Sequence, residues 1–401
     1  MVYLPMSSPD LTSAEVEAVL RVLQTPYLSI GPCITEFEAR FTAYIGTRYA
    51  VGVSSGTAGL HLCVIAAGLG EGDLVITTPF SFVASANAIL YERGLPIFVD
   101  VDPRTGNVSP ALVTEAAHAL KRGGPEARRW LPPSLRGGRL SAVSGRLKAV
   151  LPVHAFGQPA DMDPILETAR EHGLFVLEDA CEAVGAEYKG RKAGTLGDAA
   201  VFAFYPNKQM TTGEGGMVVT GRDDWAALYR SLRNQGRDVH DAWLTHSRLG
   251  YNYRMDEMSA ALGLAQLGRI EELLAKREQV AQWYNERLKG VEGVQIPFIA
   301  PSTTRMSWFV YVVRFAPEFD RNAVMAALEE RGIPSRPYFT PIHLQPLYVQ
   351  RFGYQRGDFP ATEALGDACL ALPFSSVMAE EQVDYVCESL REILKGPGVR
   401  K

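Results

Sequence analysis

The sequence predicts an α/β fold with a mainly parallel central sheet. Short, continuous runs of Val, Ile, Leu and Phe recur through residues 1–250, and segments with helical spacing of apolar residues separate them. Strands that are buried on both faces have such continuous apolar runs, and the intervening helices cover the sheet. A length of 401 residues is enough for one large domain of this kind and a smaller second one.

The elements of the large domain follow from local signals. Thr12 and Glu15 have capping-box spacing and predict an amphipathic helix that presents Val16, Val19, Leu20 and Leu23. A second helix is predicted around residues 37–44. The alternating part then predicts strands at 49–53, 74–77, 96–101, 148–153, 175–177, 199–204 and 216–220, and helices at 57–67, 84–91, 110–120 and 162–171.

The pattern changes near Met255. A long helical pattern covers residues 258–288, and a strand at 309–315, a helix at 322–331, a proline-rich stretch at 334–346 and a helix at 381–394 follow it. We therefore predict a large α/β domain over residues 1–250. A smaller C-terminal α+β domain over residues 251–401 begins with the long helix.

Composition excludes several classes of protein. The chain is 47% hydrophobic and 21% charged, as in ordinary globular proteins, and its net charge of −5 disfavours a nucleic-acid partner. Its five cysteines are scattered without a Cys-x-x-Cys pair, which argues against a disulfide framework and a structural metal site. The N-terminus lacks a signal-peptide pattern, and no apolar run approaches the roughly 20 residues that span a bilayer. We expect a cytoplasmic protein with no membrane partner.

Ligands of such sheets bind at the carboxyl ends of the strands, where the sequence places two candidate binding segments. Ser55, Gly56 and Thr57 follow the first strand and open a helix, so their backbone N–H groups could hold a phosphate. Ordinary helix capping is the alternative. Phe82 follows the second strand and could stack on a flat heterocycle, or it could belong to the core.

Two charged residues at strand ends suggest a specific cofactor. Asp179 could face a pyridine nitrogen and keep it protonated, although a capping carboxylate is the simpler alternative. Lys208 lies between an apolar strand and a Thr/Gly turn, where partial desolvation would make its amine a nucleophile toward the aldehyde of pyridoxal phosphate. A solvated loop lysine is the alternative there.

Residues 122–147 interrupt the alternation with a stretch rich in Gly, Pro and Arg. The stretch is either a solvated loop or a segment from which some arginines reach a substrate phosphate. Its arginines are Arg122, Arg128, Arg129, Arg136, Arg139 and Arg146.

The order of phosphate turn, aromatic residue, acidic strand end and lysine resembles the fold-type-I pyridoxal-phosphate enzymes. More narrowly, the chain resembles the DegT/DnrJ/EryC1/StrS family of sugar aminotransferases over nearly its whole length. The matching segments are 27–32, 37–38, 55–57, 98–102, 152–157, 178–180, 197–198, 207–208, 212–216, 250–255 and 341–343.

The resemblance implies a three-layer fold-type-I transferase and a role for each candidate. Lys208 would form the Schiff base, Asp179 would pair with the pyridine nitrogen, and Phe82 would stack on the ring. Asn252 and Arg254 would reach the phosphate and the substrate acid from the partner subunit, which implies a homodimer with shared active sites. The other implied cofactor contacts are Ser55, Gly56, Thr57, Glu182 and Asn207.

Some positions depart from the family pattern or have no firm role. Glu182 stands where many members have Gln, and a carboxylate there would repel the cofactor's phenolate unless it is protonated or turned away. The strand before the lysine has Ala203 where Ser is frequent, so Asn207, Ser54 or a backbone group would replace that phosphate contact. The proline-rich stretch offers tentative substrate contacts, Tyr338 and His343. His154 either lines the site or caps its strand.

The implied function is a transaminase that moves an amino group from glutamate or glutamine to C3 or C4 of a nucleotide-linked keto-sugar. Its cofactor would pass through pyridoxamine phosphate, and its product would enter a surface polysaccharide or a secondary metabolite. A cyclitol ketone is an alternative acceptor, and sugar dehydration an alternative reaction. The dehydrating relatives have His in place of Lys208, so the lysine argues against dehydration. A regulatory protein on the same scaffold is the alternative from a different class.

Overall fold

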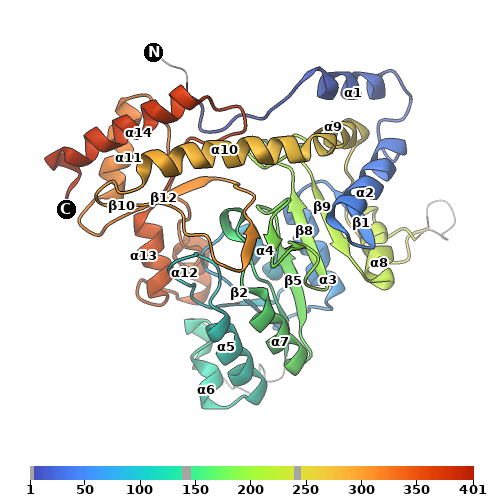
Figure 1. Cartoon of the computed structure of the whole chain (residues 1–401). Helices are drawn as coiled ribbons and strands as arrows, with labels where there is room; N and C mark the ends of the chain where they lie inside the picture. Colours follow the sequence, from blue (N-terminus) through green and yellow to red (C-terminus); the bar gives the residue numbers. More distant parts are fainter. Residues whose placement is uncertain (1–3, 138–145, 239–244) are drawn as a thin grey trace.

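A computed structural model describes residues 4–137, 146–238 and 245–401 of the chain. A seven-stranded sheet lies at its centre (Figure 1). The strand order is β1-β9-β8-β5-β4-β2-β3. Strand β9 is antiparallel to both of its neighbours, and the other neighbouring pairs are parallel, as the apolar runs predicted. The strands are β1 (Tyr49–Val53), β2 (Leu74–Thr77), β3 (Leu95–Phe98), β4 (Leu147–Val150), β5 (Phe175–Asp179), β8 (Ala199–Ala203) and β9 (Gly216–Thr220).

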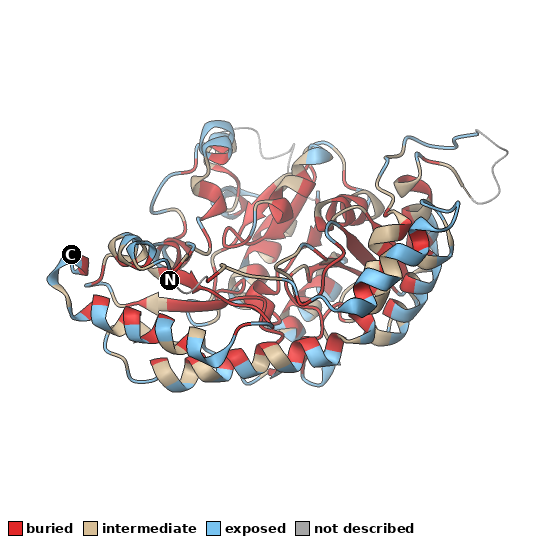
Figure 2. Cartoon of the chain, turned by 90° about the horizontal axis from the view of Figure 1, so that it is seen from above, coloured by how far each residue is buried: buried red, intermediate tan, exposed pale blue. Residues whose placement is uncertain are grey.

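Helices cover both faces of this sheet, which gives the predicted three-layer fold. Neighbouring residues of a strand point to opposite faces, so that Val218 packs into one apolar core and Met217 and Val219 into another. Figure 2 shows the buried strands beneath helices with exposed outer faces. One face carries α3 (Gly56–Ala66), α4 (Ala84–Tyr91) and α8 (Asp223–Arg233), and the other carries α2 (Pro32–Ile45), α5 (Pro110–Arg122), α7 (Met162–His172) and α9 (Glu257–Gly268).

The first helix, α1 (Ser13–Leu23), has the predicted capping box between Thr12 and Glu15. The single long helix predicted at 258–288 is wrong, because the structure has two helices there, α9 and α10 (Ile270–Leu288). Arg269 separates them with a non-helical φ of −111°, and its guanidinium donates hydrogen bonds of 2.9 Å to both Asp10 and Glu15. These partners lie about 250 residues away in sequence, so helical periodicity could not reveal the break.

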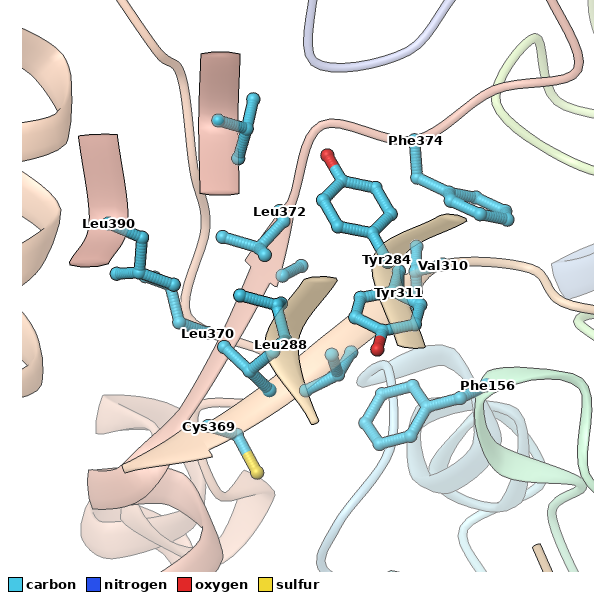
Figure 3. Close-up of a cluster of buried hydrophobic side chains, with 14 of the residues drawn as sticks. Phe156, Tyr284, Leu288, Val310, Tyr311, Cys369, Leu370, Leu372, Phe374 and Leu390 are labelled. Atoms are coloured by element: carbon cyan, nitrogen blue, oxygen red, sulfur yellow. The ribbon is translucent and has the colours of Figure 1, made fainter. Parts of the chain in front are cut away.

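The C-terminal part builds a second core on a small antiparallel sheet. Its strands are ordered β10-β12-β13, and the rings of Tyr284 and Tyr311 stack at 4.6 Å between their centroids inside this core (Figure 3). Helix α9 packs against α1 and α2, whereas α10 packs against α14. The domain boundary at residue 250 remains a prediction. The elements are β10 (Val294–Gln295), β12 (Tyr311–Phe315), α11 (Arg321–Glu330), β13 (Cys369–Leu372) and α14 (Glu380–Lys395).

Several short elements were not predicted from the sequence, and most of them are too short to show a period. They include a three-stranded sheet, β11-β6-β7, that joins residues 187–192 to the C-terminal part. The short elements are α6 (Pro125–Arg128), β6 (Glu187–Tyr188), β7 (Arg191–Lys192), β11 (Thr303–Arg305), α12 (Pro346–Phe352) and α13 (Pro360–Ala368). Among the described residues, no helix combines the length and the apolar character that crossing a membrane would need.

Glu178, in the strand that ends at Asp179, anchors the loop that leads into β8. Its carboxylate is fully buried and accepts backbone N–H hydrogen bonds from Gly194, Leu196 and Gly197 at 2.8, 2.8 and 2.6 Å, and it pairs with His154 at 2.9 Å. Burial works to raise the pKa of Glu178, but the hydrogen bonds from His154 and the backbone overcome it and hold the pKa below its ordinary value. His154 therefore supports this strand instead of lining an open site.

We expect Glu178→Gln to cost about 2–4 kcal/mol of the free energy of unfolding at neutral pH, because a neutral amide cannot accept all of these hydrogen bonds. Because the pKa of Glu178 is lower in the folded state than in the unfolded state, the ionised carboxylate stabilises the wild-type fold at pH values above the unfolded-state pKa. This stabilisation is lost as the pH falls through the folded-state pKa. The variant should therefore lose less stability in acid than the wild type. Urea unfolding between pH 7 and pH 3 measures this, with exposed Glu329→Gln as the matched control. Equal acid sensitivity in wild type and variant would contradict the assignment.

Candidate active site

Lys208 is held in a turn directly after β8, at the carboxyl edge of the sheet. Its backbone N–H donates to the carbonyl of Tyr205 at 2.9 Å, which closes the turn. The side chain is only 13% exposed, with Nζ lying 3.7 Å from Oε1 of Glu182 and 3.8 Å from the centre of the Phe309 ring. A lysine so enclosed by an aromatic ring and a carboxylate is not a solvated loop lysine.

Asp179 ends β5 and is fixed by two donors. The hydroxyl of Ser85 donates to Oδ2 at 2.6 Å, and the backbone N–H of Cys181 donates to Oδ1 at 3.1 Å. Burial raises the pKa of the Cys181 thiol, the charge of Asp179 raises it further, and the charge of Lys208 opposes this. Cys181 therefore lies within electrostatic range of both proposed catalytic groups.

The predicted phosphate turn is the N-terminus of α3. Ser55 is its N-cap and accepts a hydrogen bond from the N–H of Ala58, while the first N–H groups of the helix have no acceptor within it. At Gly56 a Cβ atom would lie 2.8 Å from both the Cβ of Ala203 and the sulfur of Cys181. Only glycine fits here, and the turn rests directly on the strand that leads to Lys208.

Phe82 and Asn207 complete the set of predicted cofactor contacts. The Phe82 side chain is 64% exposed although it follows a buried strand, so it is a surface aromatic and not a core residue. The side-chain oxygen Oδ1 of Asn207 is buried and has no hydrogen-bond partner among the described residues. An unsatisfied buried oxygen beside Lys208 is typical of a site whose ligand supplies the missing contact.

Glu182, the departure from the family pattern, faces Lys208 from within the protein. Its Oε2 accepts a hydrogen bond of 2.8 Å from the backbone N–H of Phe156. Burial raises the pKa of Glu182, and the neighbouring charge of Lys208 works against this rise. The carboxyl group is thus easier to protonate than an exposed glutamate, and protonation would relieve the repulsion that an ionised carboxylate exerts on a phenolate.

We expect Glu182→Gln to leave the protein at least as stable as the wild type at neutral pH. Because the pKa of Glu182 is higher in the folded state than in the unfolded state, the protonated carboxyl favours folding in acid. Its contribution to the stability is lost as the pH rises through the folded-state pKa. The amide is isosteric and keeps an acceptor for the Phe156 N–H. Thermal unfolding at pH 5 and pH 8 should show that the variant gains relative to the wild type at the higher pH. The opposite result, in which the variant loses stability relative to the wild type between pH 5 and pH 8, would show that the ionised carboxylate favours folding.

The tentative substrate residues separate in the structure. Tyr338 lies near the site, because its ring stacks on that of Phe309 with 6.2 Å between the ring centroids. Burial raises the pKa of Tyr338 to about 12, and the nearby charge of Glu182 contributes to this rise. His343 is fully buried, with Nε2 at 3.0 Å from Glu363 and its ring 4.7 Å from that of Phe359. Its surroundings are those of a residue that supports the fold.

Asn252 and Arg254 lie beside the end of β1 in the same protomer. The carbonyl between them, that of Tyr253, accepts the N–H of Ser54 at 2.8 Å, and Arg254 donates to Oδ1 of Asn234 at 3.0 Å. Arg254 lines a pocket of about 320 Å³ that is rich in arginine; its other lining residues are Ile30, Ile34, Arg230, Arg233, Asn234, Arg237, Asp238 and Met255.

Three arginines of residues 122–147 pair with carboxylates away from this edge. Arg122 pairs with Glu126, Arg129 with Glu115, and Arg146 with Asp73 at 2.9 Å. Asp73 precedes β2 and Arg146 precedes β4, so this pair lies at the amino ends of the strands. The structure therefore gives the substrate-phosphate interpretation no support for these three side chains, and Arg139 lies outside the described residues.

Sequence reasoning missed two residues that hold Lys208 in place, Arg277 and Phe309. Arg277 of α10 is fully buried and donates hydrogen bonds to the carbonyls of Asn207, Lys208, Trp308 and Phe309. One signal could have found it, since Arg277 lies on the helix face that also carries Leu273, Leu274, Val280 and Ala281. An arginine in an apolar stripe requires buried acceptors. No comparable signal marks Phe309 or Ser85.

The chain matches known proteins over nearly its whole length. The model of the DegT/DnrJ/EryC1/StrS aminotransferase family matches residues 9–391. The GDP-perosamine synthase of Caulobacter vibrioides is 39% identical over 97% of this chain and 98% of its own length. The spore coat polysaccharide biosynthesis protein SpsC of Bacillus subtilis is 36% identical over 98% of both chains.

Among solved structures, the aminotransferase TlmJ from Streptoalloteichus hindustanus superposes with a TM-score of 0.85. It is 30% identical in sequence, and the match covers 98% of this chain and 99% of that one. The shared architecture extends from the first helix to the last.

Proposed function

The chain belongs to the DegT/DnrJ/EryC1/StrS aminotransferase family, and on this premise we propose that it transfers an amino group from an amino acid to a nucleotide-linked keto-sugar. The observation that carries the proposal is the enclosed Lys208 at the carboxyl edge of the sheet, 3.7 Å from Glu182. The protein is thus a transaminase of amino-sugar biosynthesis. The sugar, the donor and the roles of individual residues are the finer parts of the proposal.

The residues present suit pyridoxal 5′-phosphate, the cofactor of this family. The uncapped N–H groups at Gly56 and Thr57 offer donors to a phosphate at a helix N-terminus. The exposed ring of Phe82 can cover one face of a pyridine, and Asp179 is a fixed acceptor for its protonated nitrogen. The buried oxygen of Asn207 is an acceptor with no partner in the described part of the chain.

When bound, this cofactor supplies an aldehyde that takes up the amino group and a ring that accepts the electron pair of the cleaved C–H bond. The protein's own groups do the rest. Lys208 is the residue that would hold this cofactor, and its amine would move the proton at the donor's α-carbon. Phe309 keeps water from one side of the amine, since the ring centre lies 3.8 Å from Nζ. Ser85 keeps Asp179 oriented by its 2.6 Å hydrogen bond.

Glutamate or glutamine is the donor we propose, and a keto-sugar nucleotide aminated at C3 or C4 is the acceptor. Support comes from the relatives, two of which are named GDP-perosamine synthase, at 39% and 35% identity. A GDP-linked keto-sugar is therefore the first acceptor to test.

The test is a two-part assay on the purified, cofactor-loaded protein. Glutamate or glutamine should change the visible absorption of the bound cofactor and yield the corresponding keto acid. Mass spectrometry of a panel of 3-keto and 4-keto sugar nucleotides should then show one acceptor that gains nitrogen in place of oxygen. Inosose ketones in the same panel test the cyclitol alternative. Unchanged absorption with every amino donor would reject the proposal.

We also propose that the active sites are shared between the subunits of a homodimer, with Asn252 and Arg254 acting on the partner's cofactor and substrate. Apolar side chains on α1 and the segment after it support an interface, because they are exposed on a single chain. These residues are Val16, Leu20, Leu23, Tyr27, Leu28 and Ile30.

Mixed dimers provide the test of a shared site. Lys208→Ala and Arg254→Ala subunits, each nearly inactive alone, should regain about a quarter of wild-type activity when they are coexpressed. Half of the dimers would then be mixed, and each mixed dimer would have one intact site. If the coexpressed variants were no more active than each variant alone, Lys208 and Arg254 would act in the active site of the same subunit.

A further inference from the structure

A cluster of metal-ligating side chains lies between α5 and α7, at the opposite end of the sheet from Lys208. His118 belongs to α5, and Glu171 and His172 are the last two residues of α7. The two helices pack against each other, as Figure 1 shows. Helix α7 leads into the first residue of β5, whereas Asp179 is the last residue of that strand. This cluster is therefore separate from the active site.

The three side chains are close enough to share one ion. One ligand atom from each lies within 4.8 Å of the others. Nε2 of His118 is 3.7 Å from one Glu171 oxygen, and Nε2 of His172 is 3.9 Å from the other. The two imidazole rings meet edge to face, with 4.6 Å between their centroids.

His172 shows a feature that the packing of the fold does not explain. Its side chain is only 13% exposed, and the buried Nε2 makes no hydrogen bond among the described residues. A buried polar nitrogen without a partner is costly, and such groups in native structures often mark a missing ion or water.

We propose that His118, Glu171 and His172 bind a zinc ion, with water as the fourth ligand. Two imidazoles and one carboxylate are a donor set that zinc accepts in tetrahedral geometry. Zinc ligands at ordinary bond lengths are roughly 3.4 Å apart, so the most distant pair must close by about 1.4 Å. The side chains of His118 and Glu171 are 41% and 55% exposed and have room for this movement, whereas that of His172 is only 13% exposed.

The surroundings of the three side chains affect how strongly they would bind an ion. His172 ends α7, and His118 lies near the end of α5, where the negative ends of the helix dipoles favour a cation. Lys121 lies close by with Lys148 beside it, and both positive charges oppose binding. The ion would join two helices and act on stability, not on the transfer of nitrogen.

The experiment is calorimetric titration of zinc into the cofactor-loaded protein after treatment with a chelator. We expect one equivalent to bind and, at a free zinc concentration ten times the dissociation constant, to raise the melting temperature by about 2 °C. His118→Ala, which removes an exposed ligand without disturbing the core, should weaken binding at least about tenfold, and His172→Asn should do the same. Exposed Glu167→Gln, one turn earlier on α7, is the matched control and should bind as the wild type does.

Cobalt used in place of zinc should give the visible absorption of a tetrahedral nitrogen–oxygen site, and His118→Ala should abolish it. Turnover should not differ between zinc-loaded and chelator-treated protein. Absence of saturable binding would overturn the proposal. Binding that survives both histidine substitutions would also overturn it, because the zinc would then lie at another site.

Discussion

Lys208→Ala is expected to lower turnover by at least about a thousandfold, because it removes both the covalent attachment of the cofactor and the group that moves the proton. The fold should persist. Glu182 loses its positive partner 3.7 Å away, but burial already raises the pKa of this carboxyl, so the unpaired group takes up a proton more easily than an exposed glutamate does. The effect should therefore appear in the chemistry and not in the melting temperature.

The measurement combines steady-state turnover with chemical trapping. Borohydride reduction of the wild-type protein should attach the cofactor irreversibly to the peptide that contains Lys208, and mass spectrometry would locate it. Lys208→Arg is the matched control, since it keeps a positive charge beside Glu182 and Phe309 yet cannot form the covalent bond. It should be as inactive as the alanine variant. Turnover within tenfold of the wild type in either variant would refute the assigned role.

Arg277→Met is expected to lower the free energy of unfolding by about 3–5 kcal/mol, the usual cost of breaking a buried, charge-assisted network. The guanidinium bonds the carbonyl of Lys208 at 2.6 Å and those of Asn207, Trp308 and Phe309 at 3.2 Å. Methionine fills similar space but offers no donor, so buried carbonyls lose their partners. Burial lowers the pKa of Arg277 to about 10, which still leaves it charged at neutral pH.

The same substitution should disturb catalysis, since Arg277 ties the Lys208 turn to the segment that supplies Phe309. Urea unfolding measures the first effect, and the rate of covalent cofactor capture by the folded variant measures the second. Gln282→Met, on an exposed position of the same helix, should change stability by less than about 0.5 kcal/mol. Arg277→Lys should be intermediate, because an ammonium keeps the charge and some of the donors. An Arg277→Met variant as stable as the Gln282→Met control would show that these hydrogen bonds contribute little.

Most of the fold and the first candidates for the site could be predicted from local pattern. The apolar runs at β2 and β5 and the helices between them showed a parallel sheet, and the parallel sheet indicated the edge at which to look. Asp179 and Lys208 were found because Asp179 lies at the end of a strand and Lys208 follows one. The same reasoning was wrong about residues 258–288, where Arg269 turns the chain through contacts with Asp10 and Glu15.

The sequence by itself determined the α/β architecture, the strand ends that carry Asp179 and Lys208, and the glycine turn at Gly56, because these depend on periods and spacings within a few residues. Only the tertiary structure decided what surrounds Lys208. Arg277 and Phe309 come from segments about 70 and 100 residues further along the chain, and His343 proved to be buried against Glu363. Burial and hydrogen bonding between distant segments arise from the packing of the whole chain, and no local pattern records them.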